Sequence, residues 1–203
     1  MKKKSLEMAL QQIPLYPEPK PHLEQYNTPA YIAADVLFFA HSLDDIEEKK
    51  VVDLGCGTGI FAIGAKLLGA NKVIGIDVDE RAIEIAQRAS KKLHTNVDFQ
   101  VREINDFNEE CDTVLQNPPF GAQKRHADRP FIRKALVLSR VVYSLHLSRT
   151  QKFIEREVDK FQAQVTHEKR YDFEIPYTFE FHTKEKKRFE VTMFRIERIG
   201  DKL

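Results

Sequence analysis

Val51-Val52-Asp53-Leu54-Gly55-Cys56-Gly57-Thr58-Gly59 is the stretch of this chain that decides its fold. It begins with a short apolar strand and continues through three glycines at alternate positions, and a helical pattern follows from Ile60 to Leu68. Glycine lets the backbone turn sharply and leaves no Cβ in the way of a ligand. A glycine-rich turn between a strand and a helix therefore predicts a ligand-binding loop at the carboxyl end of the strand.

A second strand, Lys72 to Asp77, supplies the acid that such a loop needs. Asp77 stands 22 positions after Gly55, a separation at which a carboxylate accepts hydrogen bonds from ribose hydroxyls. The glycine spacing differs from the Gly-x-Gly-x-x-Gly of dinucleotide sites, and the absence of a following Gly-Lys-Ser/Thr excludes a P-loop. Asp53 would repel a pyrophosphate but suits a cationic methionine group. We therefore expect S-adenosylmethionine as cofactor and S-adenosylhomocysteine as product; the alternative is a glycine turn without a ligand.

Strand and helix patterns alternate along most of the chain, which indicates a parallel sheet covered on both faces. Two long strands without a helix between them close the chain, so an antiparallel pairing is expected there. Together these elements predict a Rossmann-like class I methyltransferase fold, with a seven-stranded, mostly parallel sheet and an antiparallel last strand. The predicted strands are 51–54, 72–77, 97–101, 112–116, 141–146, 163–171 and 189–199, and the predicted helices are 28–43, 60–68, 79–89, 131–140 and 150–161. In the first helix, Thr28 is expected as the cap and Pro29 as the first helical residue.

Asn117-Pro118-Pro119-Phe120 ends the fourth strand, where parallel sheets bind their ligands. An aromatic exocyclic amine is a poor nucleophile because its lone pair is delocalised into the ring. The Asn117 side-chain oxygen and the Pro118 carbonyl can each accept one amine proton, which favours a pyramidal nitrogen as positive charge develops. The prolines hold this acceptor pair rigid, and Phe120 offers a face for base stacking. The motif predicts methylation of a planar amine, on a base that is unpaired or flipped out.

A third acid is expected at the end of the third strand, beside the cofactor adenine. Glu103 and Asp106 both qualify, and Glu103 is preferred because it directly follows Val101-Arg102. The complete predicted cofactor site comprises Gln25, Thr28, Asp53, Gly55, Cys56, Gly57, Gly59, Ile60, Asp77, Val78, Glu103 and Asn117.

The whole chain is nearly neutral, with 32 basic and 31 acidic residues among 203, so nucleic-acid contacts must come from local patches. The two patches expected to bind RNA comprise Lys124, Arg125, Arg129, Arg133 and Lys134 in the first, and His182, Lys184, Lys186 and Lys187 in the second. Tyr143 and His146 are expected to be packing residues. The acidic run Asp44-Asp45 and Glu47-Glu48 is expected to be a solvated loop.

Length and cysteine content limit the remaining possibilities. A chain of 203 residues fits one domain, and no apolar run is long enough to span a bilayer. Cys56 and Cys111 lack the paired spacing of a zinc site and cannot build a disulfide framework, so no metal and a reducing cytoplasmic location are expected.

The two motifs together resemble the class I amino-methyltransferases. Three further stretches resemble the methyltransferase-like protein five family, which methylates an adenine at N6 in small-subunit ribosomal RNA. They are Leu23-Glu24-Gln25-Tyr26-Asn27-Thr28-Pro29, Val142-Tyr143-Ser144-Leu145-His146 and Phe181-His182-Thr183-Lys184. The resemblance covers about Leu23 to Ile199.

This resemblance implies a leader, residues 1–27, that contributes to the cofactor pocket, followed by a single methyltransferase domain, residues 28–203. It also implies that Gln25 and Thr28 close the cofactor pocket, and that a small zinc-binding activator protein is a possible partner. The chain departs from the family in a short stretch between Glu103 and Cys111, and in Glu103 where the family commonly has Asp.

Three other functions are compatible with the motifs. Glutamine side chains of proteins and adenines of DNA are also planar amines or amides. However, glutamine methyltransferases of this type commonly carry an N-terminal helical domain and a tyrosine after the two prolines, and DNA enzymes usually need a target-recognition region. The third alternative is a cofactor-binding scaffold for ribosome assembly that has no activity, against which the intact glycine loop, Asp77 and Asn117 argue.

Overall fold

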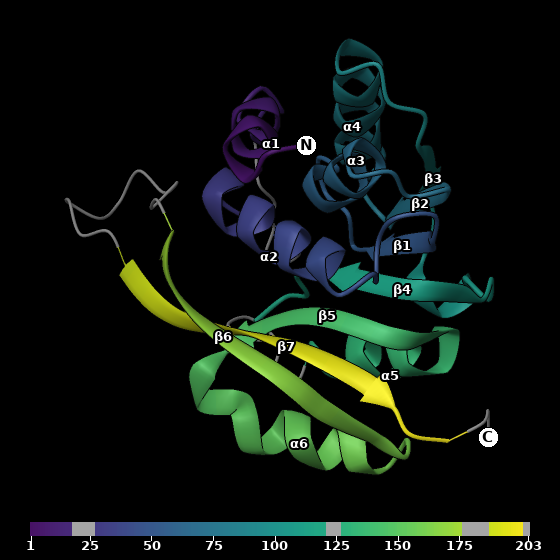
Figure 1. Cartoon of the computed structure of the whole chain (residues 1–203), viewed down its shortest axis with the longest axis vertical. Coiled ribbons are helices and arrows are strands. Elements are labelled where there is room, and N and C mark those ends of the chain that lie inside the picture. Colours follow the sequence, from purple (N-terminus) through teal and green to yellow (C-terminus); the bar gives the residue numbers. More distant parts are fainter. Residues whose placement is uncertain (18–26, 121–126, 176–186, 201–203) are drawn as a thin grey trace.

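The computed structural model describes residues 1–17, 27–120, 127–175 and 187–200, and its centre is a seven-stranded sheet (Figure 1). The strand order is β3-β2-β1-β4-β5-β7-β6, and every neighbouring pair is parallel except the two that include β7. This arrangement confirms the predicted sheet and its antiparallel last strand. The strands are β1 (Lys50–Leu54), β2 (Lys72–Asp77), β3 (Asp98–Val101), β4 (Cys111–Gln116), β5 (Ser139–Leu147), β6 (Ala163–Ile175) and β7 (Lys187–Arg198).

Helices cover both faces of the sheet, as predicted. Figure 1 shows α1 to α4 on one side of the sheet and α5 and α6 on the other, and two separate clusters of buried side chains fill the two interfaces. The helices are α1 (Lys3–Leu10), α2 (Ala30–Ser42), α3 (Ile60–Leu67), α4 (Glu80–Lys92), α5 (Arg129–Leu138) and α6 (Gln151–Asp159).

The leader contributes a helix to the domain core. Leu6 and Leu10 of α1 are buried, and α1 packs on α2 and α3. Burial of such a side chain contributes roughly 2 kcal/mol. The three helices approach closely at Gly64, where a Cβ would lie 2.3 Å from Leu37 Cδ1. Helix α1 therefore belongs to the same hydrophobic core as α2 and α3.

The junction between α5 and β5 differs from the predicted boundary. The helix ends at Leu138 and the strand begins at Ser139, two residues earlier than predicted. Ser139 has an extended backbone, and its hydroxyl donates to the carbonyl of Ala135 in the last turn of the helix. Because the segment from Val137 to Val142 is apolar with a single charge, its periodicity alone could not locate this change.

The last two strands extend beyond the rest of the sheet. Leu147 at the end of β5 pairs with Val191, whereas β7 residues before Val191 pair only with β6. This two-stranded arm leaves the sheet at the carboxyl edge of β5 and is visible beyond β5 in Figure 1. Phe173 in the arm is buried, so the base of the arm belongs to the core.

Candidate active site

The carboxyl ends of β1, β2 and β4 place the predicted motifs side by side. In the parallel registers, Leu54 of β1 lies opposite Ile76 of β2 and opposite Gln116 of β4. The glycine loop, Asp77 and Asn117 each follow or end these strands, so they meet at one edge of the sheet. Their common location was predictable from the sequence, because each of them lies at the carboxyl end of a strand and these strands were predicted to be parallel.

The glycine loop has the conformation that its composition predicts. Gly55, Gly57 and Gly59 have φ values of 68°, 52° and 86°, in the left-handed region that disfavours other residues. A Cβ on Gly57 would meet no atom within 4 Å, whereas a Cβ on Gly59 would lie 2.8 Å from Phe99 Cζ. Gly57 therefore borders open space at the mouth of the loop, and Gly59 is required for close packing.

Cys56 and Ile60, two further residues of the predicted cofactor site, lie within and directly after the glycine loop. The amide of Cys56 donates to the carbonyl of Ile76, and the Cys56 side chain is buried. The amide of Gly59 donates to the Cys56 carbonyl, which closes the turn before Ile60 begins α3.

Asp77 is attached to this loop through its side chain. Its carboxylate accepts the amide of Gly57 at 2.8 Å and the amide of Asp79 at 2.9 Å. Burial raises the pKa of Asp77, and these backbone donors oppose that shift. A carboxylate has about four acceptor positions, so acceptor capacity is left for a ribose hydroxyl. The following residue, Val78, is 40% exposed and offers an apolar surface beside them.

Asp53 is more deeply buried than we expected for a residue that contacts the cofactor. It is 1% exposed, and its carboxylate accepts the amide of Ala62 in the first turn of α3 at 3.0 Å. Burial raises the pKa of Asp53 to about 8, with the Ala62 hydrogen bond acting in the opposite direction. The side chain thus stabilises the start of α3 from below the glycine loop, and its contact with the cofactor stays a prediction.

The two candidates for the third acid lie at the end of β3. The amide of Arg102 donates to the carbonyl of Asp77 at 2.8 Å, which draws the chain after β3 toward the cofactor edge. Glu103 follows directly and is exposed, whereas Asp106 lies at the end of the next 3-10 turn, Ile104–Asp106. This geometry favours Glu103, and its contact with the adenine stays a prediction.

Asn117 has its side chain held in one orientation. Its Nδ2 donates to Thr28 Oγ1 at 2.9 Å, and its Oδ1 is buried without a hydrogen-bond partner among the residues that the structure describes. Buried polar atoms almost always have partners, so an orphaned acceptor at this position is consistent with a site for a donor group from a ligand.

Phe120 lies three residues after Asn117 and is half-buried. Its ring packs edge-on against the Phe173 ring, with 5.9 Å between the ring centroids.

Thr28 therefore acts differently from its predicted role as a helix cap. The cap position of α2 is occupied by Pro29, no side chain caps the helix, and α2 begins at Ala30. The Thr28 hydroxyl is engaged by Asn117 instead and is buried. The prediction was wrong on this point because a hydroxyl before a proline is ambiguous until a distant partner is known. Gln25 lies outside the described residues.

Tyr16 of the leader also reaches the cofactor edge, and the sequence analysis did not predict this contact. Its hydroxyl donates to Asp79 Oδ2 at 2.9 Å, and both side chains are buried. The other Asp79 oxygen accepts the amide of Arg81 and caps α4. A single tyrosine in a proline-rich segment carries no local signal of such a contact.

The predicted RNA-binding residues that the structure describes are partly engaged within the protein. Arg133 pairs with Glu157 at 2.7 Å and Arg129 lies 3.9 Å from the same carboxylate, yet both arginines remain substantially exposed. Lys134 donates to the carbonyl of Asn105 and to the Asn108 side chain. Lys187 begins β7. The other members of the two patches, Lys124, Arg125, His182, Lys184 and Lys186, lie outside the described residues.

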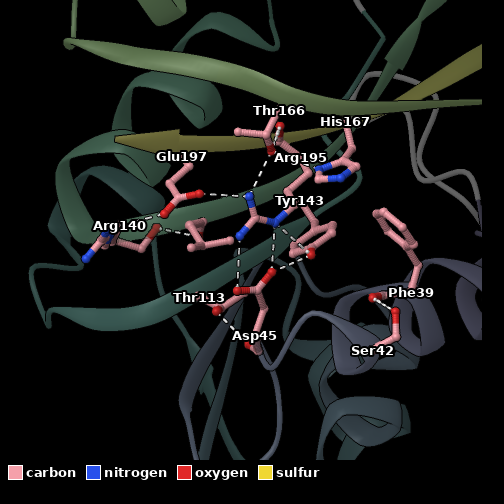
Figure 2. A network of polar contacts seen from close by, with 12 residues as sticks. Phe39, Ser42, Asp45, Thr113, Arg140, Tyr143, Thr166, His167, Arg195 and Glu197 are labelled. Carbon is pink, nitrogen blue, oxygen red and sulfur yellow. Dashed lines mark hydrogen bonds and ion pairs between the residues drawn. The ribbon is translucent and has the colours of Figure 1, made fainter. Parts of the chain in front are cut away.

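The expectation of a solvated acidic loop was wrong for Asp45. Figure 2 shows its side chain buried against β5 and β7, where it accepts hydrogen bonds from Arg195 at 2.8 Å and from Tyr143 at 2.5 Å. The backbone carbonyl of Asp45 accepts the Thr113 hydroxyl. Tyr143 is 1% exposed, so it packs as predicted, and burial together with Asp45 raises its pKa. This network attaches the loop after α2 to the far half of the sheet.

The described ranges contain neither a metal-binding cluster nor a membrane-spanning helix. No group of three or more His, Cys, Asp or Glu side chains there could hold a metal ion, and both cysteines are free. None of the helices in these ranges combines the length and the apolarity needed to cross a bilayer.

Comparison with known proteins identifies the family of this chain. Residues 37–118 match the family of ribosomal protein L11 methyltransferase (PrmA). The chain is 43% identical to protein MJ0284 of Methanocaldococcus jannaschii over 98% of this chain and 96% of that protein. It is 36% identical to the rRNA N6-adenosine-methyltransferase METTL5 of Danio rerio over 96% of this chain and 98% of that protein.

A solved structure is similar over the same length. It is the structure of PH1948 from Pyrococcus horikoshii, described as a candidate RNA methyltransferase, with 40% identity, a TM-score of 0.92 and coverage of 98% and 99% of the two chains. The methyl donor of such enzymes is S-adenosylmethionine. The described residues fit it, because Gly57 borders open space and Asp77 keeps acceptor capacity. The chain belongs to the METTL5 family of S-adenosylmethionine-dependent methyltransferases.

Proposed function

We propose that this protein methylates the exocyclic N6 amine of an adenosine in structured RNA, and that this RNA is ribosomal RNA of the small subunit. The orientation of Asn117 carries the proposal. Its amide nitrogen is bound to Thr28 and its buried oxygen lacks a described partner, so it is arranged to accept a proton from an amine. Near full-length similarity to the rRNA N6-adenosine-methyltransferase METTL5 supports the choice of substrate.

The chemistry at Asn117 follows from the weakness of the nucleophile. Bound S-adenosylmethionine supplies a methyl group on a positively charged sulfur. Asn117 Oδ1 and the Pro118 carbonyl accept the two amine protons, which turns the nitrogen lone pair out of conjugation with the ring. These hydrogen bonds strengthen as positive charge develops on nitrogen, so they stabilise the transition state more than the bound substrate.

Two further features support a base as substrate. Pro118 carries one of the two acceptors and Pro119 follows it, and their fixed φ angles restrict the backbone directly after Asn117, so little reorganisation is needed when the amine arrives. Phe120 is half-buried against Phe173, which fixes the plane on which an unpaired base would stack. An adenine within a duplex would have to be flipped out to reach this site.

The proposed cofactor contacts follow from the same geometry. We assign Asp77 to the ribose hydroxyls, Glu103 to the adenine amine, and the open space at Gly57 to the methionine part. The buried carboxyl of Asp53 lies under this loop, where a nearby cationic group would favour its ionised form.

The proposed partners are a structured RNA and a small activator protein. Arg129 and Arg133 lie on α5, directly after the segment that carries the Asn-Pro-Pro-Phe motif. Their side chains are 39% and 45% exposed, and we assign them to contacts with RNA phosphates. We also propose a small zinc-binding activator protein as partner and a cytoplasmic location, following the family resemblance. Both can be tested by purification of the native protein from its source.

The function is tested by incubation of the purified protein with labelled S-adenosylmethionine and either small ribosomal subunits or their naked RNA. The RNA is then digested to nucleosides. We expect the label in N6-methyladenosine. Label found only in protein would favour a glutamine side chain as the acceptor, and label in DNA but not RNA would favour a DNA adenine. Cofactor binding without any transfer, in the presence and absence of the activator, would favour a non-catalytic scaffold.

A further inference from the structure

Four buried polar side chains form a continuous hydrogen-bonded series under the loop that carries Asn117. Gln116 Nε2 donates to Ser144 Oγ at 2.9 Å, Ser144 Oγ lies 2.6 Å from His146 Nε2, and His146 Nδ1 lies 3.2 Å from Asp128 Oδ2. All four side chains are buried, with Ser144 at 0% exposure and His146 at 1%. The proposed chemistry at Asn117 uses none of them directly.

The first and last residues of this series, Gln116 and Asp128, flank a single segment of the chain. Gln116 is the last residue of β4 and directly precedes Asn117, and Asp128 directly precedes α5. Between them lies the segment 117–127, which starts with the Asn-Pro-Pro-Phe motif. We propose that Ser144 and His146 are positioning residues for methyl transfer, because they join both ends of this segment and hold Asn117 in place.

The donors in this series can all point in one direction. The only hydrogen-bond donor of the Gln116 side chain is its amide nitrogen, so Ser144 Oγ accepts there and its own proton can go to His146 Nε2. The remaining ring proton is then on Nδ1 and is donated to Asp128. Aligned donors of this kind polarise one another, which strengthens the series inside a buried environment.

The same series also positions the first turn of α5 against the cofactor loop. The Asp128 carbonyl accepts the amide of Ile132 at 3.1 Å. In the same turn, the Phe131 ring packs so closely on Gly55 that a Cβ there would lie 2.9 Å from Phe131 Cε1. The Asp128 end of the series is therefore connected to the glycine loop through one helical turn.

A nucleophilic role for these residues is excluded by burial. Serine, histidine and aspartate are the residue types of hydrolase triads. A nucleophile must reach its substrate, but Ser144 has no exposed surface and its hydroxyl lies between Gln116 and His146. Its contribution is therefore to geometry.

Ser144→Ala breaks the series at its centre with a minimal change in volume, and Ser139→Ala is a matched control. Ser139 lies on the same strand, is 1% exposed, and donates hydrogen bonds to the carbonyls of Ala135 and Val141 at the other end of β5. The two variants are compared with the wild type in kcat, in KM for S-adenosylmethionine, in Tm, and in amide hydrogen exchange at Ile132.

We expect Ser144→Ala to lower kcat about tenfold, with KM for the cofactor changed less than about threefold, because small displacements of reacting groups have effects of this size. Exchange at Ile132 should be faster. Ser139→Ala should lower Tm to a similar extent without either effect. Asp128→Ala should reproduce the loss in kcat, and the double variant Ser144→Ala/Asp128→Ala should lose no more than either single variant.

Wild-type kcat together with wild-type exchange in Ser144→Ala would overturn the inference, as would equal losses of kcat in Ser139→Ala or additive losses in the double variant. The inference rests on the proposed function, but the two fail separately. If the wild-type protein methylates no RNA, the proposed function fails, and exchange at Ile132 in the same variants still decides whether the series holds this segment.

Discussion

The Asn117 amide nitrogen donates a hydrogen bond of 2.9 Å to the hydroxyl of Thr28, a residue 89 positions earlier in the chain. This contact joins a residue two positions before α2 to the residue directly after β4. The two polar atoms of the Asn117 side chain therefore have different roles: the nitrogen is hydrogen-bonded within the protein, and the oxygen is left for a ligand. The activity of this METTL5 family member should therefore depend on a threonine that does not touch the methyl group.

Replacement of Thr28 by valine tests this dependence. Valine has nearly the same shape but cannot accept the Asn117 hydrogen bond, so the amide can rotate and its oxygen loses its fixed direction. We expect kcat to fall about tenfold, since one hydrogen bond contributes on the order of 1 kcal/mol. Thr28→Ser retains the hydroxyl and should stay near the wild-type rate. Steady-state kinetics of the three proteins give the answer, and equal rates for valine and serine would contradict the role.

Asn117→Ala and Asp77→Ala should separate chemistry from cofactor binding. Loss of the Asn117 oxygen removes a transition-state contact, and such losses commonly lower kcat by about 100-fold or more. Calorimetric titration with S-adenosylhomocysteine should show nearly unchanged affinity for Asn117→Ala but clearly weaker binding for Asp77→Ala. Loss of binding in Asn117→Ala would contradict its assigned role in catalysis.

The glycine loop offers a second separation, between binding and folding. Gly57→Ala adds a methyl group where the structure has open space, at a positive φ of 52°, so its cost in stability should be about 1 kcal/mol. Because the proposed cofactor occupies that space, its dissociation constant should rise at least about tenfold.

Gly59→Ala is the matched comparison, because its methyl group would lie 2.8 Å from Phe99 Cζ and 3.1 Å from Ala86 Cβ. It should destabilise the protein by roughly 2–4 kcal/mol in urea denaturation, since backbone strain and overpacking add. Equal losses of stability in the two alanine variants would show that Gly57 also has a packing role.

Asp53 should make the cofactor-free protein less stable as pH rises. Burial raises its pKa to about 8 from an ordinary 3.8, so at intermediate pH the folded protein holds a proton that the unfolded chain has released. The stability contributed by the neutral carboxyl is fully present below about pH 4 and is lost as pH rises through about 8. Asp53→Asn keeps an oxygen for the Ala62 amide without the charge, and serves as the reference. We expect the Tm of the wild type to fall relative to this variant between about pH 6 and pH 8, and a parallel course would contradict the shift.

The buried network around Asp45 should matter for stability. Arg195→Met leaves the Asp45 carboxylate without its cationic partner, and removal of one member of a buried pair typically costs about 3–5 kcal/mol. Tyr143→Phe removes one hydrogen bond and should cost about 1–2 kcal/mol. Arg140→Ala, which breaks an exposed ion pair with Glu197, should cost less than about 1 kcal/mol. Urea denaturation measures all three, and a different order would contradict the network shown in Figure 2.

Sequence alone was sufficient to predict the sheet, its direction and the placement of the main motifs. The glycine loop, Asp77 and Asn117 each follow a strand, and parallel strands bring their carboxyl ends to one edge whatever the details of packing. Apolar periodicity located α2 to α6 for the same reason, because it depends only on which face of a local element is buried, but α1 was not predicted. It was less accurate at the boundary between α5 and β5, where an apolar run is compatible with both structures.

Only the tertiary structure decided which polar side chains face one another. Thr28 was expected to cap a helix and instead holds Asn117, Asp45 was expected in solvent and instead binds Arg195, 150 residues away, and Tyr16 reaches Asp79 from a segment with no pattern of its own. A hydroxyl, carboxyl or phenol can bond with many partners, and its own sequence neighbourhood does not select one. The selection is made when packing buries the group, because a buried polar atom must find whichever partner the fold brings within reach.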